Sequence, residues 1–233
     1  LIFADGRVDD TFDNVVSTIP VTSLLKSLGH PADHVNIDFR SMVLVFLEVP
    51  RERISPYSWA YFSDPDISFQ RTTEFSHFEA EMNPEGAAGL CLEISCSTED
   101  EVWRTSDIEI EDRIRTELER VGMLDRDVPC KAHIIRKKFV YPIQFIGHVE
   151  TIEKILEPVR SLSNVVTTGR HSLHKYCNMN ECMEMAFDGA DQISKNSGKF
   201  SYDLIGKWKG AGLEAERTLQ VPTVPSGRNG VKV

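Results

Sequence analysis

Apolar residues recur along the chain in short runs, and the spacing within each run predicts the element that it forms. Between residues 41 and 97, runs rich in β-branched and aromatic side chains are separated by Pro, Asp and Gly turns, as in a set of short strands. The run SMVLVFLEV is the most regular of them. We expect four strands of one antiparallel sheet, at residues 41–49, 58–62, 69–75 and 89–97.

A helix with a defined start follows this predicted sheet. Ser106 and Glu109 have the spacing of a capping box, and acidic residues fill the first turn. One apolar helical face then extends to the next glycine, and it carries Ile110, Ile114, Leu118 and Val121. Beyond this helix we expect a strand at 131–141 and a helix at 148–157 that Pro158 breaks or kinks.

Two further apolar runs, at 13–20 and 164–168, have the continuous hydrophobicity of strands buried in a parallel sheet. A short helix at 21–28 follows the first run. The second run leads through a loop to a helix that begins with the capping spacing of Asn178 and Glu181. We expect one apolar face on this last helix, made of Met179, Cys182, Met183, Ala186, Ala190 and Ile193.

Charge, length of apolar runs and cysteine content narrow the functional classes. A formal charge of −10 argues against binding to a nucleic-acid backbone, which requires a basic surface. The longest purely apolar run, at 42–47, is far too short for a transmembrane segment. Five cysteines and the absence of a signal-peptide pattern favour a reduced, cytoplasmic setting over a disulfide framework.

The segments 164–170 and 176–180 combine features that can hold an anion or an electron-rich carbonyl. A buried strand delivers Gly169, whose missing side chain lets a ligand approach the backbone, and Arg170 adds a planar cation. The helix that starts near Asn178 adds free N–H groups and the positive end of its dipole. A plain strand-loop-helix crossover with an asparagine cap has the same pattern, so these segments alone leave both interpretations open.

Four sequence motifs that include these segments follow one another along the chain. They are DNVVSTIP at 13–20, YPI at 141–143, Gly169-Arg170 followed by Tyr176 and NMN at 178–180, and finally Gly189-Ala190. In their order and spacing they resemble the flavin-containing amine oxidase superfamily, and above all its protoporphyrinogen-oxidase-like proteins and UDP-galactopyranose mutases. The resemblance extends from about residue 12 to residue 193, which is most of the chain.

The resemblance implies an FAD-dependent oxidoreductase whose flavin accepts a hydride from a small-molecule substrate held by the antiparallel sheet. The implied fold is α+β, with a substrate-binding, mostly antiparallel sheet domain at 35–147. Residues 1–34 and 148–195 would supply strand and helix elements that complete a Rossmann-like FAD domain. Residues 196–233 would then be a tail, partly disordered because its end is rich in Pro, Gly and polar residues.

On the same basis, FAD would contact the ends of the two parallel strands and the start of the last helix. Gly169 and Arg170 would approach its pyrophosphate, while Met179 and Asn180 would place an N–H group near the pyrimidine carbonyl of the flavin. That carbonyl becomes negative on reduction, so a helix amino terminus stabilises the reduced form. The implied cofactor-binding residues are Thr18, Pro20, Gly169, Arg170, Asn178, Met179 and Asn180.

The sequence departs from this superfamily at several points. It lacks the dinucleotide fingerprint G-x-G-x-x-G, so we expect the chain to be the carboxy-terminal part of a longer protein. The missing amino-terminal dinucleotide-binding segment would then complete the FAD site. Two histidines after Gly169-Arg170, at 171 and 174, and Pro158 also differ from the superfamily pattern.

Arg136, Tyr141 and Tyr176 are the candidates for substrate binding, and no residue stands out as a catalytic acid or base. Arg136 belongs to the most basic cluster of the chain, whose cations would suit the pyrophosphate of a sugar nucleotide. Alternation along a strand places Arg136 and Lys138 on one face and Lys137 on the other. A solvated strand face is the simpler interpretation of the same cluster.

Alternative functions remain open. One is an FAD-dependent sugar-nucleotide mutase of the UDP-galactopyranose mutase type, in which reduced flavin acts without net redox change. Another is a non-catalytic binding domain. A zinc site is not predicted, because the potential ligands lack a C-x-x-C spacing and one of them lies on an apolar helical face; they are His171, His174, Cys177 and Cys182.

Overall fold

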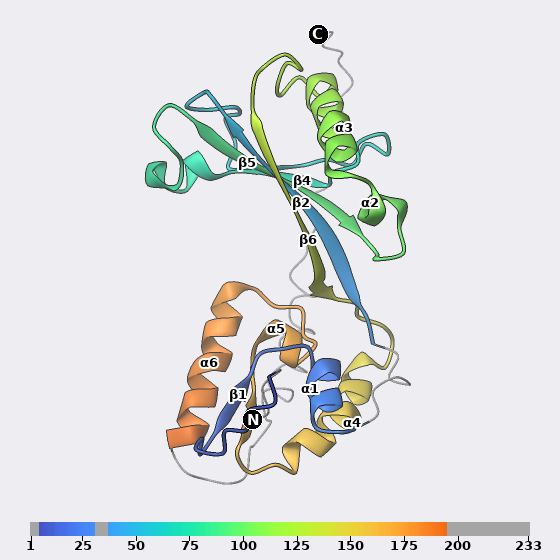
Figure 1. Cartoon of the computed structure of the whole chain (residues 1–233), viewed down its shortest axis with the longest axis vertical. Helices are drawn as coiled ribbons and strands as arrows, with labels where there is room; N and C mark the ends of the chain where they lie inside the picture. The colour runs from blue at the N-terminus through green and yellow to red at the C-terminus, as the bar shows by residue number, and fades with distance from the viewer. Residues whose placement is uncertain (1–4, 31–36, 195–233) are drawn as a thin grey trace, which may run out of the picture.

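The computed structural model describes residues 5–30 and 37–194, which form two lobes (Figure 1). The sheet lobe spans residues 39–142. The helical lobe contains residues 5–30 together with 143–194, so the sheet lobe is inserted between its two parts. The tail expected at 196–233 lies outside the described residues.

The sheet lobe is one antiparallel sheet in the strand order β3-β4-β5-β2-β6. The central strand β2 pairs along most of its length with β5 on one side and β6 on the other. The four strands predicted between residues 41 and 97 are therefore confirmed, and the strand predicted at 131–141 joins the same sheet. The bounds are Phe39–Val49 (β2), Trp59–Tyr61 (β3), Arg71–Glu74 (β4), Ala88–Cys96 (β5) and Lys131–Pro142 (β6), with 3₁₀ turns η1 at Phe75–His77 and η2 at Ala80–Met82.

Within the described residues, the α-helices of this lobe pack on one face of the sheet, and η1 packs on part of the other, where Phe75 stacks on Phe46. The predicted capping box is present at the start of α3 (Asp107–Arg120), where Ser106 Oγ accepts a hydrogen bond from Glu109 N and the Glu109 carboxylate accepts one from Ser106 N. A short helix, α2 (Glu101–Arg104), precedes it. Alternate residues of β2 and β5 pack with α3 into one apolar core, which includes Val43, Val45, Leu47, Leu90, Leu92, Ile94, Ile110, Ile114 and Leu118.

The helical lobe is held together by two strands from distant parts of the chain. β1 (Val15–Ser17) pairs in parallel with β7 (Val165–Thr167), and the four helices of this lobe are α1 (Val21–Ser27), α4 (His148–Arg160), α5 (Gly169–Ser172) and α6 (Met179–Ser194), counted among the described residues. The α+β fold is thus confirmed, whereas two strands alone do not establish a Rossmann-like domain. No described helix has both the length and the apolar character needed to cross a membrane.

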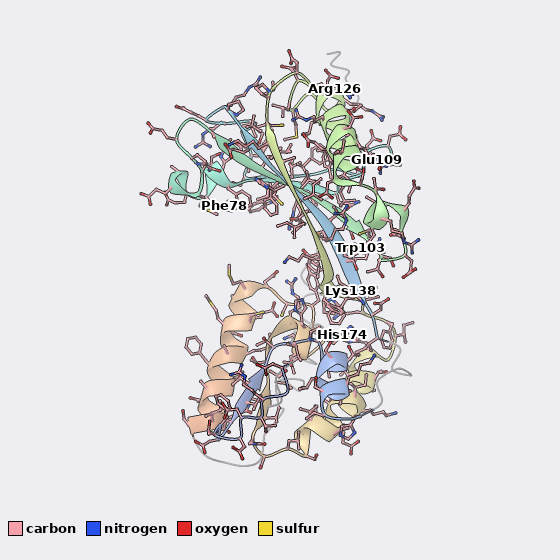
Figure 2. The ribbon with its side chains drawn as sticks, in the orientation of Figure 1. Phe78, Trp103, Glu109, Arg126, Lys138 and His174 are labelled. Carbon is pink, nitrogen blue, oxygen red and sulfur yellow. The ribbon has the colours of Figure 1, made fainter. Side chains whose placement is uncertain are left out.

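The two lobes meet at the ends of β2 and β6, where His174 is buried (Figure 2). His174 Nε2 lies 2.9 Å from the carbonyl oxygen of Asp38, and its Nδ1 lies 2.9 Å from His148 Nε2. Ile143 N donates to the same Asp38 carbonyl at 2.9 Å. His174 and Ile143 therefore both bond to the residue that precedes β2, and His148 of α4 bonds to His174.

α4 does not end at Pro158, where the sequence predicted a break or a kink, so the predicted helix end at residue 157 is wrong. α4 continues through Pro158 to Arg160. A proline removes only one N–H donor, and here it does so near the end of the helix, while Ile155, Leu156 and Val159 are buried in the core of the lobe. Packing of this apolar side keeps the last turn helical.

The apolar face predicted for α6 is also wrong in part. Met179 and Met183 are 75% and 58% exposed, whereas Met185 and Gly189 are buried against the lobe. Apolar residues lie on both sides of this helix, so periodicity could not identify the buried side. Of the predicted face, Cys182 and Ile193 are partly buried, and the other four residues are exposed.

Candidate functional site

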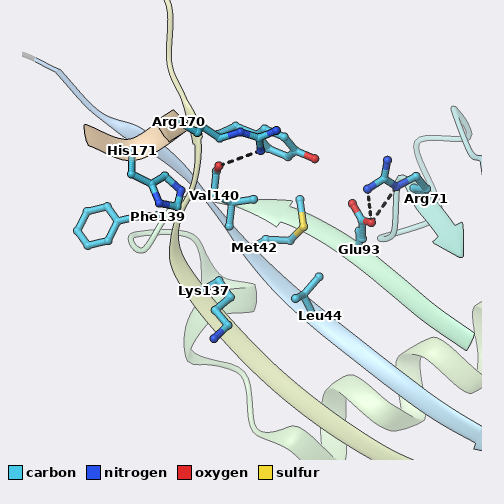
Figure 3. Close-up of a pocket in the computed structure, with 10 residues that line it drawn as sticks. Met42, Leu44, Arg71, Glu93, Lys137, Phe139, Val140, Arg170 and His171 are labelled. Carbon is cyan, nitrogen blue, oxygen red and sulfur yellow. Dashed lines mark hydrogen bonds and ion pairs between the residues drawn. The ribbon is translucent and has the colours of Figure 1, made fainter. Parts of the chain in front are cut away.

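A pocket of about 460 Å³ lies between the uncovered face of the sheet and the start of α5 (Figure 3). Both lobes line it, because its residues come from four strands of the sheet and from α5. They are Met42, Leu44, Arg71, Glu93, Lys137, Phe139, Val140, Tyr141, Arg170 and His171.

Strand alternation decides which side chains reach this pocket. Val43 is buried on the face covered by α3, so its neighbours Met42 and Leu44 point to the open face. The same alternation in β6 places Lys137 in the pocket and Arg136 on the other face. The pocket therefore lies on the face of the sheet opposite α3.

Arg136, which was predicted to bind substrate, does not line the pocket. Its guanidinium donates to the carbonyls of Trp103 and Thr105 at 3.0 and 2.6 Å, and to the Asp107 carboxylate at 2.6 Å. These bonds fix the connection between α2 and α3 against β6. Lys137 is the residue of the basic cluster that lies in the pocket instead.

The guanidinium of Arg170 lies beside Tyr141 and Tyr176, two residues predicted to bind substrate. Its guanidinium carbon is 5.0 Å from the ring centroid of Tyr141 and 5.5 Å from that of Tyr176. Arg170 Nε donates to the Cys177 carbonyl at 3.1 Å, and Nη2 donates to the same oxygen. The arginine is thus held against the wall of the pocket by a loop and two aromatic rings.

The pocket has an excess of positive charge. Arg71 and Glu93 are cross-strand partners joined by a hydrogen bond of 2.8 Å from Arg71 Nε. Burial opposes the charged form of Arg71, but the hydrogen bond to Glu93 raises its pKa above the ordinary value, so the guanidinium stays charged. Lys137 and Arg170 add two cations, and three cations against one carboxylate suit a ligand with an anionic group.

The predicted cofactor residues Thr18, Pro20 and Gly169 lie at the carboxyl ends of β1 and β7. The two strands are parallel and in register, and Thr168 N donates to the Ser17 carbonyl at 3.0 Å, so both following segments leave the same edge. Gly169 has a φ of +85° and open space where a Cβ would stand. A side chain there would be strained, and the glycine leaves its backbone accessible to a ligand.

Three buried hydroxyl groups near this edge have no hydrogen-bond partner among the described residues: those of Ser17, Thr168 and Ser172. Buried hydroxyl groups in folded proteins are normally satisfied. Hydroxyl groups can donate to acceptor oxygens such as those of the diphosphate and ribose of FAD. The structure is therefore compatible with the cofactor that the sequence resemblance implies.

The remaining predicted cofactor residues, Asn178, Met179 and Asn180, form the start of α6, and their side chains are exposed. Asn178 N donates to the Glu181 carboxylate at 2.8 Å, as the capping spacing predicts. N–H groups in a first helical turn have no intrahelical acceptor, so those of Met179 and Asn180 can bind an acceptor from outside the helix. These three residues do not line the 460 Å³ pocket.

The sequence does not single out Arg71, Glu93 or Lys137 as residues of the pocket. Arg71 and Glu93 face each other only because β4 and β5 pair in one register, which the sequence does not reveal. Lys137 was recognised as part of a basic cluster, but strand alternation does not say which face stays open. Within the described ranges, no group of three His, Cys, Asp or Glu side chains is arranged to hold a metal ion.

Comparison with known proteins adds a likeness in fold. No protein-family model matches the sequence, and no curated protein is significantly similar to it. A solved structure of reduced UDP-galactopyranose mutase is 24% identical with a TM-score of 0.59, over 75% of this chain and 38% of the mutase. A protein from Exiguobacterium sp. 255-15 named for protoporphyrinogen oxidase is 15% identical with a TM-score of 0.61, over 79% of this chain and 41% of that protein.

Both names fall within the group of proteins that the sequence resembles, so the predicted resemblance is confirmed at the level of the fold. The chain spans about two fifths of the length of these solved proteins, 38% in one case and 41% in the other. From its antiparallel sheet to its pair of parallel strands, the chain has the fold of part of UDP-galactopyranose mutase and of a protoporphyrinogen-oxidase-like protein.

Proposed function

We propose that this chain is part of an FAD-dependent oxidoreductase, with its substrate held against the open face of the antiparallel sheet. The observation that carries the proposal is the pocket to which both lobes contribute. Its sheet side supplies Lys137 and the ion pair of Arg71 with Glu93, and its other side supplies Arg170 and His171. Arg170 follows Gly169, so substrate and cofactor would meet at one short segment.

The edge of β1 and β7 would hold the FAD. Gly169 leaves room for close approach of a phosphate group, and the neighbouring buried hydroxyl groups of Ser17 and Thr168 have no hydrogen-bond partner among the described residues. The N–H groups of Met179 and Asn180 would stabilise negative charge that develops near the start of α6. The bound flavin would supply the acceptor for a hydride removed from the substrate.

The open sheet face would orient the substrate. Tyr141 and Phe139 offer aromatic surface, and Lys137 and Arg170 offer positive charge for an anionic group. Arg170 would act chiefly through position, because its guanidinium is already bonded to the Cys177 carbonyl. We assign no catalytic acid or base to the chain.

A sugar-nucleotide mutase is the second candidate, and the charge of the pocket favours it. The excess of cations around Lys137, Arg71 and Arg170 would suit the diphosphate of a sugar nucleotide. In a mutase the flavin must be reduced beforehand, and it ends the cycle in the same state. Reduction of the flavin by the substrate alone would therefore support the oxidoreductase, whereas activity only after prior reduction would support the mutase.

The visible absorption spectrum of the purified protein is the deciding first measurement. We expect the protein expressed with its upstream sequence to have a flavin spectrum, and this chain alone, incubated with FAD, to bind it weakly or not at all. A spectrum without flavin from the longer protein would contradict the proposal. It would leave a non-catalytic binding domain as the remaining function.

A pair of lysine variants tests the role of the pocket. Replacing Lys137 by Met keeps the aliphatic length but removes the charge, and we expect it to weaken substrate binding about tenfold or more. Lys131→Met is the matched control, because Lys131 belongs to the same strand but pairs with Glu48 and does not line the pocket. Equal affinities in the two variants would show that the pocket is not the substrate site.

A further inference from the structure

Cys177 and Cys182 bring two thiol groups into contact beside the candidate site. Their Sγ atoms are 3.5 Å apart, and both cysteines are free. Cys177 lies near the end of the loop between α5 and α6, while Cys182 lies in the first turn of α6. A disulfide bond needs an S–S distance of about 2.05 Å, so a small movement of the loop would bring the sulfur atoms within bonding distance.

The two thiols differ in exposure, and this difference gives each a distinct role. Cys177 is only 1% exposed, and burial, together with the neighbouring Cys182 thiol, raises its pKa to about 11. Cys182 is only partly buried and lies in the first turn of α6. An oxidant from solution would therefore reach Cys182 first, and Cys177 is positioned to react second.

We propose that Cys177 and Cys182 are a dithiol site that a hydroperoxide oxidises to an intrachain disulfide. The Cys182 thiolate attacks one peroxide oxygen and becomes a sulfenic acid, while the other oxygen takes up a proton and leaves as water, or as an alcohol if the hydroperoxide is organic. The Cys177 sulfur then attacks the Cys182 sulfur and expels the sulfenic oxygen as a second water molecule. With hydrogen peroxide, two thiols and one peroxide give one disulfide and two water molecules.

Oxidation at this site would be transmitted to Arg170. The carbonyl oxygen of Cys177 accepts two hydrogen bonds from the Arg170 guanidinium, which also contacts Tyr141 and Tyr176. Drawing Cys177 towards α6 would move this carbonyl and the arginine that it holds. Dithiol oxidation itself needs no flavin, so it can be tested independently of the proposed enzymatic function.

Peptide mapping of the full-length protein treated with low hydrogen peroxide tests the proposal. Trypsin cleaves after Lys175, so both cysteines fall in one tryptic peptide, and a protease that cleaves after Glu181 separates them. We expect the tryptic peptide to lose two hydrogen atoms, to resist alkylation, and to stay joined after cleavage at Glu181 until dithiothreitol is added. Methionine oxidation in the same peptide adds oxygen and is therefore distinguished by mass.

Single serine variants supply the controls. In Cys177→Ser the sulfenic acid of Cys182 has no partner, so we expect it to be trapped by dimedone, whereas Cys182→Ser should give neither a disulfide nor a trapped adduct. Cys130→Ser, in the sheet lobe, should form the disulfide as the unaltered protein does. Unchanged alkylation of both thiols after peroxide treatment, or a disulfide that depends on Cys130, would overturn the proposal.

Discussion

Arg170 is the side chain on which the candidate site converges. The sequence landmarks identified Arg170, Tyr141 and Tyr176 one by one, and strand and loop signals placed them in separate elements. The structure adds that one guanidinium lies against both rings and is bonded to the Cys177 carbonyl. Such proximity depends on how the lobes pack, which local sequence patterns do not encode.

Replacing Arg170 by Ala should therefore destabilise the helical lobe. The change removes the hydrogen bonds to Cys177 and the contacts with two tyrosine rings, and we expect a loss of about 1–3 kcal/mol in the free energy of unfolding. Urea denaturation measures the free energy of unfolding. Arg126→Ala is the control, since Arg126 makes an exposed ion pair with Asp112 worth below about 1 kcal/mol. Equal losses would mean that Arg170 is not a structural anchor.

The connection between the two lobes depends on a pair of buried histidines. The Asp38 carbonyl can only accept, so His174 Nε2 carries the proton, and Nδ1 of the neutral ring accepts from His148 Nε2. Burial lowers the pKa of both histidines. A proton added to His174 would face the N–H of His148, so the elements β2, α4 and α5 are joined best when both rings are neutral.

This arrangement predicts a loss of stability in mild acid. The folded-state pKa lies below the unfolded value of about 6.5, so the unfolded chain binds protons first as the pH falls. The free energy of unfolding therefore keeps its full contribution from the histidines above about pH 6.5 and decreases below it. We expect the melting temperature to decrease between about pH 7.5 and 5.5. His148→Gln, which can still donate to His174, should flatten this decrease. His30→Gln, at an exposed position, should not; identical pH profiles would contradict the prediction.

The secondary structure could be predicted well where one physical signal dominates. The capping box at Ser106 and the apolar run of β2 both fix their elements locally. The continuation of α4 past Pro158 and the orientation of α6 could not be predicted, because burial of Leu156 and Met185 in the packed lobe decides them. Local patterns indicate that an element forms, while its partners decide which side is buried.

The helical lobe leaves apolar side chains uncovered on both α6 and β1. Phe187 and Met183 of α6 are 75% and 58% exposed, and Val16 of β1 is 52% exposed. Uncovered apolar surface of this kind favours self-association. The two-lobed chain taken alone should therefore be poorly soluble.

Sedimentation velocity can check this expectation. We expect the isolated chain to form oligomers or aggregates, and the double variant Met183→Lys with Phe187→Lys to reduce them. Ile108→Lys is the control, because Ile108 is even more exposed but lies on α3, in the sheet lobe. A monodisperse isolated chain that melts cooperatively would contradict the prediction.

The pairing of β1 with β7 also has a consequence for how the chain folds. Val15 meets Val165 only after the entire sheet lobe has been synthesised between them, whereas the strands of that lobe pair with closer partners. Closing so long a loop costs less entropy once the intervening segment is compact. We therefore expect the sheet to fold first, and the amino-terminal strand to wait for β7 to leave the ribosome before the helical lobe can close.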